Sequence, residues 1–583
     1  MDRREIRFRG VGASPGIARG RLFCFMLPPP DVAARKVTDV DKEIGRFNAG
    51  LERTAQQLAE MGERISRELS PTIGQFLEIQ VMILEDRELK TEVENFIKVY
   101  QTNSEYAFNE IMKRHSEKLL ASKSKYFQDR TIDLWDLTHR VIRNLAGIKH
   151  TSVIDAPKRT IIAAHDLPPS EAALLNPEMV VGLACERGGE TSHTAIMAKA
   201  FGIPAVLGVE GLMKRIQDNL PGIIDGYKGV VIVNPRPKTV SLYNHRIREI
   251  QSYEKRLDEF RGLQPFTKDG RHIELSANIE LPAEVIAVKK NEAEGIGLFR
   301  TEFLYLSIGE PPTEEDQFEV YSWVVKELSP KPVIIRTYDL GGDKFIPDYE
   351  EANPFLGLRA IRFCLTEPDI FKVQLRAILR ASHYGNVKVM FPMISTVEEL
   401  KRAKVILKGV MGDLVREGVP FDENLEVGIM IETPSAALLA DRLARYVDFF
   451  SIGSNDLTQY VLAVDRSNLK VAKLFDHFHP SVLRLIKSVI DIGHKHHIWV
   501  GLCGEMASDP FGLVLLLGME IDELSMNPLA IPTAKRVITS LKIKDISSVV
   551  MRCLEYATAL EVRRHLNKCL RSLLPEEVLG PPV

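Results

Sequence analysis

Cysteine is scarce in this chain, and the few cysteines are scattered. The 583 residues include six, and no two of them form a Cys-x-x-Cys pair. This pattern excludes the disulfide framework of small secreted domains and is typical of proteins from a reducing compartment. A charge excess of one sign is also lacking, because the formal net charge is -3 at pH 7. Without an overall basic surface we expect no nucleic-acid partner, although local basic clusters can still bind small anions.

Long hydrophobic runs are absent as well. The longest, from Phe511 to Met519, is far shorter than the roughly 20 apolar residues that a membrane helix needs. The opening residues MDRREIRFRG are charged and contain no apolar segment like that of a secretion signal. We therefore expect a cytoplasmic protein that does not insert into a membrane.

The first part of the chain combines two sequence patterns. Residues 36–145 predict a helical bundle, because apolar side chains recur at helical spacing from Ile44 to Ile65, Ile73 to Leu89, Tyr106 to Leu120 and Tyr126 to Leu145. Residues 1–35 and 146–243 instead hold short β-branched runs between helical segments, such as RTIIAA and GVVIVN. We expect these two stretches to form one α/β domain into which the bundle is inserted.

The second part of the chain has the pattern of a barrel. After a charged helical stretch at residues 244–262, which we expect to be a linker, residues 263–583 contain eight short apolar segments. They are IELSANIE, GIGLFRTEF, PVIIRTYDL, KVMFPMIS, LEVGIMIET, FFSIGSNDL, WVGLCGEM and IDELSMNP. Apolar strands that alternate with helices favour parallel pairing, and eight of them favour a (β/α)8 barrel. The predicted fold class is multidomain α/β, with a C-terminal (β/α)8 TIM barrel and an N-terminal α/β domain that carries the inserted bundle.

Charged and reactive residues gather where the predicted barrel strands end. They are Arg300, Glu302, Arg336, Asp339, Glu432, Asn455, Asp456, Cys503 and Glu505. In a barrel this end of the strands carries the chemistry. Arginines match phosphate and carboxylate oxygens, and Glu432 with Asp456 are the best candidates for a Mg²⁺ site. The pattern predicts a polyanionic substrate held with a divalent metal, although any one of these residues can also belong to an ordinary loop salt bridge.

Two further residues have both a chemical and a structural interpretation. Cys503 in GLCGEM can be a protonated general acid or an inert packed side chain. His193 in GGETSHTAIMAKA follows two glycines at the expected start of a helix, where backbone N–H groups favour a phosphate. It can carry a phosphoryl group, or it can be an ordinary histidine of an N-capped helix.

The chain resembles enzyme I of the phosphoenolpyruvate-dependent sugar phosphotransferase system, or phosphoenolpyruvate-protein phosphotransferase. The motifs that carry the resemblance are SPGIARG, GGETSHTAIMAKAFGIPAVLG, GIGLFRTEFL, RTYDLGGDK, NPFLGLRAIR, IETPSAA, FFSIGSNDLTQYVLAVDR and GLCGEMASDP, which follow in order over nearly the whole length. Pyruvate phosphate dikinase and phosphoenolpyruvate synthase share some of them. Here, however, a helical insertion precedes His193 and no GxxxxGK[ST] loop occurs.

The resemblance implies a function for each matching residue. His193 corresponds to the phosphorylated histidine of the α/β domain, and Cys503 to the acid that protonates the enolate to pyruvate. The phosphoenolpyruvate site would comprise Arg300, Arg336, Arg359, Asn455, Asp456 and Arg466. Glu432 and Asp456 would bind Mg²⁺. The resemblance further implies that the inserted bundle binds the carrier protein HPr and that the barrel domain forms a homodimer.

Four positions depart from the family pattern. Gln80 replaces a frequent histidine, Trp135 a usual arginine, and Pro168 and Ala172 two common threonines. These departures leave open which protein accepts the phosphoryl group and how fast the group is transferred to it. A phosphoenolpyruvate-dependent sensor that regulates partner proteins is a further alternative. Trp135 can be an interface anchor or a core residue of the bundle.

Overall fold

A computed structural model describes most of the chain. The described residues are 4–25, 32–68, 80–120, 125–147, 153, 156–172, 174–189, 192–308, 311–341, 351, 353–466, 468 and 470–573. The chain separates into two compact units, Met1–Glu249 and Ile250–Val583. No helix within the described ranges is both long and apolar enough to span a membrane.

The first unit contains a mixed sheet of eight strands in the order β1-β8-β7-β3-β4-β5-β6-β2. The strands are β1 Ile6–Arg9, β2 Val11–Ser14, β3 Ile17–Phe25, β4 Thr160–Ala164, β5 Val180–Cys185, β6 Ala205–Leu207, β7 Pro221–Asp225 and β8 Val230–Val233. The pairs from β3 to β6 are parallel, and the helices α6 Pro169–Ala172 and α7 His193–Ala200 lie between these strands in sequence. β3 and β4 are neighbours although the bundle separates them in sequence, which confirms the predicted insertion.

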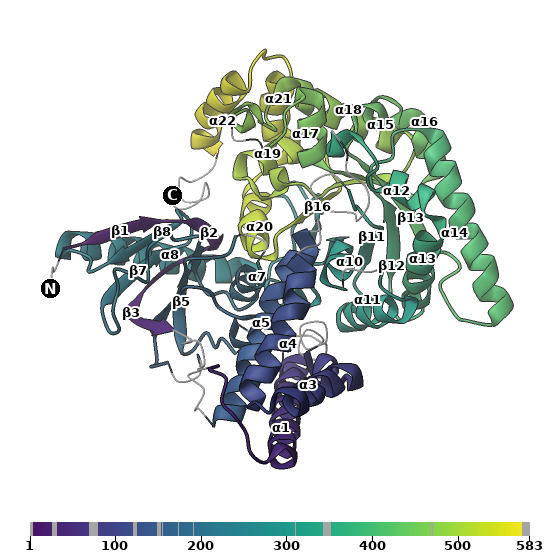
Figure 1. Ribbon diagram of the computed structural model, residues 1–583. Helices are drawn as coiled ribbons and strands as arrows, with labels where there is room; N and C mark the ends of the chain where they lie inside the picture. The colour runs from purple at the N-terminus through teal and green to yellow at the C-terminus, as the bar shows by residue number, and fades with distance from the viewer. Residues whose placement is uncertain are drawn as a thin grey trace. The chain divides into compact units, whose positions relative to one another are not determined.

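The bundle contains α1 Val40–Glu68, α3 Arg87–Tyr100, α4 Ser104–Leu120 and α5 Lys125–Ala146 (Figure 1). Phe47 of α1 packs on Phe108 of α4, with ring centroids 5.9 Å apart. The expected helix from Ile73 to Leu89 is wrong in part. Residues 73–79 lie outside the described ranges, and α3 begins only after Asp86, whose side chain caps it by accepting a 2.7 Å hydrogen bond from the Glu88 N–H. The aspartate side chain satisfies a free N–H group at the start of α3, so a new helix begins here and the expected one does not continue.

The helix α8, Pro237–Arg261, begins in the first unit and ends in the second. Its first turns pack on the sheet, because Tyr243 donates a 3.1 Å hydrogen bond to Asp225 and Asn244 accepts a 3.2 Å bond from Arg19. Proline suits the first turn of a helix, which explains why the helix starts before the predicted linker.

The second unit is a closed barrel of eight parallel strands. They are β9 Glu274–Ile279, β10 Gly295–Phe299, β11 Val333–Arg336, β12 Val387–Phe391, β13 Glu426–Ile431, β14 Phe449–Ile452, β15 Trp499–Leu502 and β16 Glu523–Met526. All eight predicted segments are confirmed.

The described helices of this unit, apart from the end of α8, are α9 Val285–Lys290, α10 Glu302–Ile308, α11 Glu314–Leu328, α12 Ile361–Thr366, α13 Pro368–Ser382, α14 Val397–Glu417, α15 Pro434–Leu438, α16 Ala440–Leu443, α17 Ser454–Leu462, α18 Pro480–Lys495, α19 Pro510–Gly518, α20 Ile531–Ser540, α21 Ile543–Cys553 and α22 Ala559–Leu573. Figure 1 shows α11, α13 and α14 outside β11, β12 and β13.

The barrel interior is packed. Side chains from several strands fill it, namely Leu298, Ile334, Met390, Met430, Phe449 and Cys503, with Trp499 against them. Phe449 and Trp499 stack with centroids 4.4 Å apart. A filled interior leaves the carboxyl ends of the strands as the face that a substrate can reach.

Candidate functional site

A continuous chain of arginines and carboxylates lies at the carboxyl ends of the barrel strands. Arg336, the last residue of β11, donates to Glu302 at 2.9 Å and contacts Asp339 at 3.4 Å. Arg359 donates two hydrogen bonds to Asp339, of 2.8 and 3.0 Å, and one to Asp456, of 2.9 Å. All five side chains are buried. The arginines are therefore held in fixed orientations by charged partners, as a preformed anion site requires.

The backbone turn that presents Arg359 depends on a close approach. Gly341 has φ +99°, and a Cβ there would lie 2.4 Å from the Leu358 carbonyl oxygen. The Ala360 N–H donates to the Leu340 carbonyl at 2.8 Å, which joins the same two segments. Only glycine adopts this conformation at this distance without strain.

Two of the carboxylates are suited to a cation. Glu432 follows β13 directly, is 1% exposed, and accepts a 2.6 Å hydrogen bond from the Met393 N–H. Burial, followed by repulsion from Asp456 and Asp339, raises the pKa of Glu432 to about 8. A divalent cation between Glu432 and Asp456 would relieve that repulsion.

The donor set fits Mg²⁺ better than a metal that needs a full protein cage. Within the described ranges no group of three or more His, Cys, Asp or Glu residues is arranged to hold an ion. Mg²⁺ usually takes one or two carboxylates and completes its shell with substrate oxygens and water. A pair of carboxylates beside buried arginines therefore suffices for it.

Cys503 follows β15 and is 3% exposed. Its thiol lies 3.8 Å from the Ile452 carbonyl oxygen. Burial raises the pKa of Cys503 to about 11, against the opposing effects of the Ser451 hydroxyl and the Arg336 guanidinium. The thiol therefore keeps its proton at neutral pH, as a general acid must.

The remaining predicted barrel residues form a more exposed rim. The Arg300 side chain is 36% exposed and pairs with Glu280. Asn455 and Glu505 exchange two hydrogen bonds, of 3.2 and 3.1 Å, and Arg466 lies 4.0 Å from the same Glu505 carboxylate. The structure thus brings every predicted barrel residue to one end of the barrel.

The sequence analysis missed one member of this network. Tyr460 accepts a 3.1 Å hydrogen bond from Arg359 and donates one of 2.6 Å to the Phe355 carbonyl. It thereby holds Arg359 from the side opposite Asp339. Its position one helical turn after Asp456 in α17 is the sequence signal that could have identified it.

His193 lies in the first unit, at the first position of α7. Ser192 caps the helix by accepting a 3.3 Å hydrogen bond from the Ala195 N–H, and Thr194 donates to the Leu167 carbonyl at 3.2 Å. The side chain of His193 and residues 190 and 191 lie outside the described part. The helix start predicted from the two glycines is present.

The residues that depart from the family pattern lie in different surroundings. Gln80 and Ala172 are buried, whereas Trp135 is 49% exposed and contacts His139, with ring centroids 3.8 Å apart and ring planes tilted by 34°. Half of the indole faces outward, so Trp135 lies on the bundle surface and not in its core.

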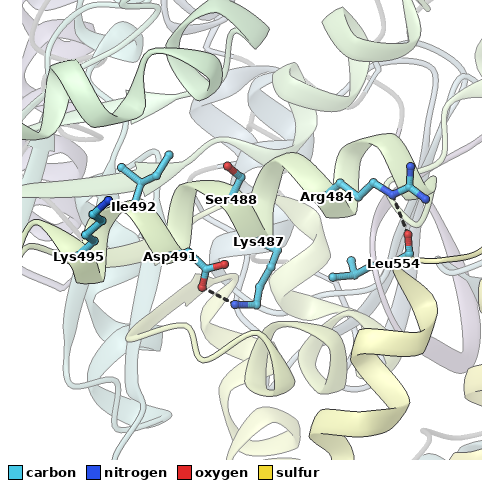
Figure 2. Close-up of a pocket in the computed structure, with 7 residues that line it drawn as sticks. All are labelled: Arg484, Lys487, Ser488, Asp491, Ile492, Lys495 and Leu554. Carbon is cyan, nitrogen blue, oxygen red and sulfur yellow. Dashed lines mark hydrogen bonds and ion pairs between the residues drawn. The ribbon is translucent and has the colours of Figure 1, made fainter.

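A separate hollow of about 330 Å³ lies on the outside of the barrel (Figure 2). Its lining residues are Arg484, Lys487, Ser488, Asp491, Ile492, Lys495 and Leu554. All but Leu554 follow one side of α18. Three of its four charged side chains have partners, because Lys487 pairs with Asp491 and Arg484 donates to the Leu554 carbonyl at 2.7 Å. It shares no residue with the barrel mouth.

Comparison with known proteins gives three family matches along the chain. The model for the PEP-binding domain of PEP-utilising enzymes matches residues 254–543, that for their N-terminal domain residues 9–130, and that for their mobile domain residues 156–229. Phosphoenolpyruvate-protein phosphotransferase of Priestia megaterium is 41% identical over 95% of this chain and 97% of its own. The protein of that name from Bacillus subtilis (strain 168) is 40% identical over 95% and 98%.

A solved structure is also similar in part. The NMR solution structure of an Enzyme I protein (nEIt) covers 42% of this chain and 99% of its own, at 34% identity and a TM-score of 0.38. The full-length relatives match both units in one continuous alignment. The chain therefore belongs to the phosphoenolpyruvate-protein phosphotransferase family of PEP-utilising enzymes.

Proposed function

We propose that this protein transfers the phosphoryl group of phosphoenolpyruvate to its own His193 and then to a histidine of the carrier protein HPr, releasing pyruvate. The buried chain of Arg336, Asp339, Arg359 and Asp456 at the barrel mouth is the observation that carries the proposal. The two arginine side chains are held in place and can bind a phosphate, and the carboxylates beside them can bind a metal ion. Family membership supports the same activity.

The arginines would bind the phosphate and take up the charge that develops on it. Arg336 has a buried Nε atom with no hydrogen-bond partner among the described residues, which leaves this donor for an anion. Arg300 and Arg466, at the rim, retain exposed guanidinium surface. Donors held in place before the reaction stabilise the transition state without further reorganisation. Asn455 would contact the substrate from the same rim.

Glu432 and Asp456 would hold Mg²⁺, which would neutralise charge on the phosphate and on the pyruvate enolate. The raised pKa of Glu432 supports this role, because a buried carboxylate beside two others favours a bound cation over the bare charge. Arg359 would keep Asp456 oriented through its 2.9 Å hydrogen bond.

Cys503 would complete the first half-reaction. When the phosphoryl group leaves for the His193 imidazole, the enolate remains at the mouth, and the Cys503 thiol gives its proton to the methylene carbon. Pyruvate then departs. The burial that keeps the thiol protonated also keeps water away from the enolate.

The second half-reaction would use the first unit. The N–H groups at the start of α7 favour a phosphoryl group on His193, and the bundle of residues 36–145 would bind HPr. We further propose a phosphohistidine domain of residues 1–35 and 146–243, a linker of residues 244–262, and a phosphoenolpyruvate-binding barrel of residues 263–583 that forms the homodimer. A cytoplasmic location would suit such a phosphoryl relay.

The direct test is to incubate the purified protein with Mg²⁺ and phosphoenolpyruvate and to search for acid-labile phosphate on His193 by peptide mass spectrometry. We expect one phosphate per chain, together with pyruvate, and none after chelation or in His193→Ala. Labelling that persists in His193→Ala would refute the assignment of the histidine. Binding of phosphoenolpyruvate without any labelling would favour a sensor over an enzyme.

A further inference from the structure

The backbone of Cys503 is held by an amide side chain from another strand. Asn278, the residue before the last in β9, donates a 2.9 Å hydrogen bond from Nδ2 to the Cys503 carbonyl oxygen. The pairing of β15 with β16 ends at Leu502 and Leu524, so Cys503 is the first residue beyond it. In the barrel β16 lies between β15 and β9. The amide therefore reaches past β16 to the peptide group that follows the last strand pair.

A hydroxyl group fixes the orientation of this amide. Ser525 on β16 is fully buried and donates a 2.6 Å hydrogen bond to Asn278 Oδ1. Because the amide oxygen accepts this bond, the NH₂ group is the end that faces Cys503. Gly297 on β10 leaves room for the hydroxyl, since a Cβ there would lie 2.6 Å from the Ser525 oxygen. Ser525, Asn278 and Cys503 thus form a chain in which each acceptor has a donor.

Two further contacts fix the same short segment. The Cys503 N–H donates to the Ile452 carbonyl at the end of β14, at 3.1 Å. Gly504 lies against Ser454 at the start of α17, where an added Cβ would overlap the Ser454 hydroxyl oxygen. The segment is therefore held from β14, from α17 and, through Asn278, from β9. Together these contacts set the direction in which the Cys503 side chain leaves the backbone.

Direction matters for a group that donates a proton to carbon. In the proposed reaction the Cys503 thiol must lie within reach of the enolate methylene carbon. A displacement of about 1 Å can cost about 10²-fold in rate even when every reacting group is present. A hydrogen bond to the carbonyl of the reacting residue itself is well placed to prevent such a displacement.

We propose that Asn278, oriented by Ser525, is a positioning residue that aims the Cys503 thiol at the enolate. The proposal rests on the proposed role of Cys503 as the acid. Asn278 acts on the thiol through the carbonyl of the same residue, so it supports protonation of carbon and not transfer of the phosphoryl group. Asn278→Asp keeps the size of the side chain but replaces the donor by an acceptor, which would repel the Cys503 carbonyl.

The experiment measures both products of the first half-reaction. Full-length protein is mixed with Mg²⁺ and phosphoenolpyruvate, phosphate on His193 is measured after an alkaline quench, and pyruvate is followed with lactate dehydrogenase and NADH. In Asn278→Asp we expect pyruvate formation to fall at least about tenfold and phosphorylation of His193 to fall less than about threefold. Phosphorylation in the same sample shows that the variant folds and binds substrate. Ser525→Ala should show the same split with a smaller loss, and it provides the test if Asn278→Asp does not fold.

A double variant distinguishes positioning from a general structural role. Asn278→Asp combined with Cys503→Ala should form pyruvate no more slowly than Cys503→Ala alone, because both changes act on one step. Asn291→Asp is the matched control and should match the wild type. Asn291 is also buried, and its amide donates a 2.9 Å hydrogen bond to a carbonyl, that of Ala287, but it lies at the end of α9.

Equal slowing of both products in Asn278→Asp would overturn the positioning role, and so would a further loss in the double variant. Pyruvate formation at the wild-type rate in a folded Asn278→Asp protein would overturn it as well. If the wild type itself formed no pyruvate, or if Cys503→Ala formed it at the wild-type rate, the proposed function would fail instead.

Discussion

At the scale of single residues, the barrel mouth contains both arginines with a fixed positive charge and a thiol that keeps its proton. Arg336 and Arg359 are fixed by Glu302, Asp339 and Asp456, so their positive charge is present before a substrate binds. Cys503 differs from these arginines, because burial raises the pKa of its thiol and keeps the thiol uncharged. The two kinds of group can therefore be separated by mutation.

Replacing the thiol should block pyruvate release more than phosphoryl transfer. In Cys503→Ala the enolate forms but has no proton donor, so we expect pyruvate formation to fall about 10²–10⁴-fold while phosphorylation of His193 falls far less. Rapid-quench measurement of both products in one reaction checks this. Cys553→Ala is the control, because Cys553 is equally buried but lies in α21. Equal losses in both steps would make Cys503 a packing residue.

The buried carboxyl of Glu523 should make stability depend on pH. Its pKa is raised from 4.5 to about 8, so the folded protein holds this proton more tightly than the unfolded chain does. Its contribution is fully present below about pH 4.5 and is lost as pH rises through about 8. We therefore expect the wild type to lose stability relative to Glu523→Gln between pH 5 and 8. Thermal unfolding of both proteins across this range measures the difference, and parallel curves would contradict it.

At the scale of elements, short segments place the reactive groups. The cap at Ser192 starts α7 at His193, and the cap at Asp86 separates α3 from the helical residues before it. In the bundle, Arg46 of α1 joins Glu105 of α4 at 2.7 Å and the Leu145 carbonyl of α5 at 2.8 Å. One arginine thus ties together α1, α4 and α5, the last of which carries Trp135.

That surface can be tested through Trp135. If the indole is an anchor for HPr, Trp135→Ala should raise the KM for HPr about 10- to 30-fold, because interface tryptophans commonly contribute 2 kcal/mol or more. The loading of His193 from phosphoenolpyruvate should not change. Tyr100→Ala, which removes a 60% exposed aromatic side chain from the end of α3, is the matched control. Unchanged transfer in both variants would exclude Trp135 from the interface.

At the scale of the whole molecule, the two sites of the proposed reaction belong to different compact units. His193 lies in Met1–Glu249 and the barrel mouth in Ile250–Val583, with α8 as the covalent connection. Such a division allows one unit to bind the substrate without help from the other. The proposed transfer would require His193 and the barrel mouth to meet, and a linker that moves can allow this.

This division predicts independent binding. In His193→Ala the barrel should bind phosphoenolpyruvate, in the presence of Mg²⁺, within about twofold of the wild-type affinity, because the residues of the barrel mouth all belong to the second unit. Arg336→Lys, which loses the planar fork, should weaken binding by at least about tenfold. Isothermal titration calorimetry compares the three proteins. Loss of binding in His193→Ala would show that the histidine belongs to the substrate site.

Much of the fold was open to prediction from local patterns. The eight barrel segments were found because each is a short apolar run between helices. The strands β1, β2 and β7 were missed, because glycine, proline and arginine interrupt their apolar pattern. They are strands because neighbours in the sheet satisfy their backbone groups, which no local pattern records.

The sequence by itself determined the barrel, the insertion and the identity of the residues at the strand ends, because strand periodicity and residue chemistry are local properties. Only the tertiary structure decided which charges neutralise one another, that Tyr460 supports Arg359, and that the Glu523 carboxyl enters the space beside Gly501. These relations join residues far apart in sequence. Barrel closure sets the distances between them, and burial then sets their pKa values.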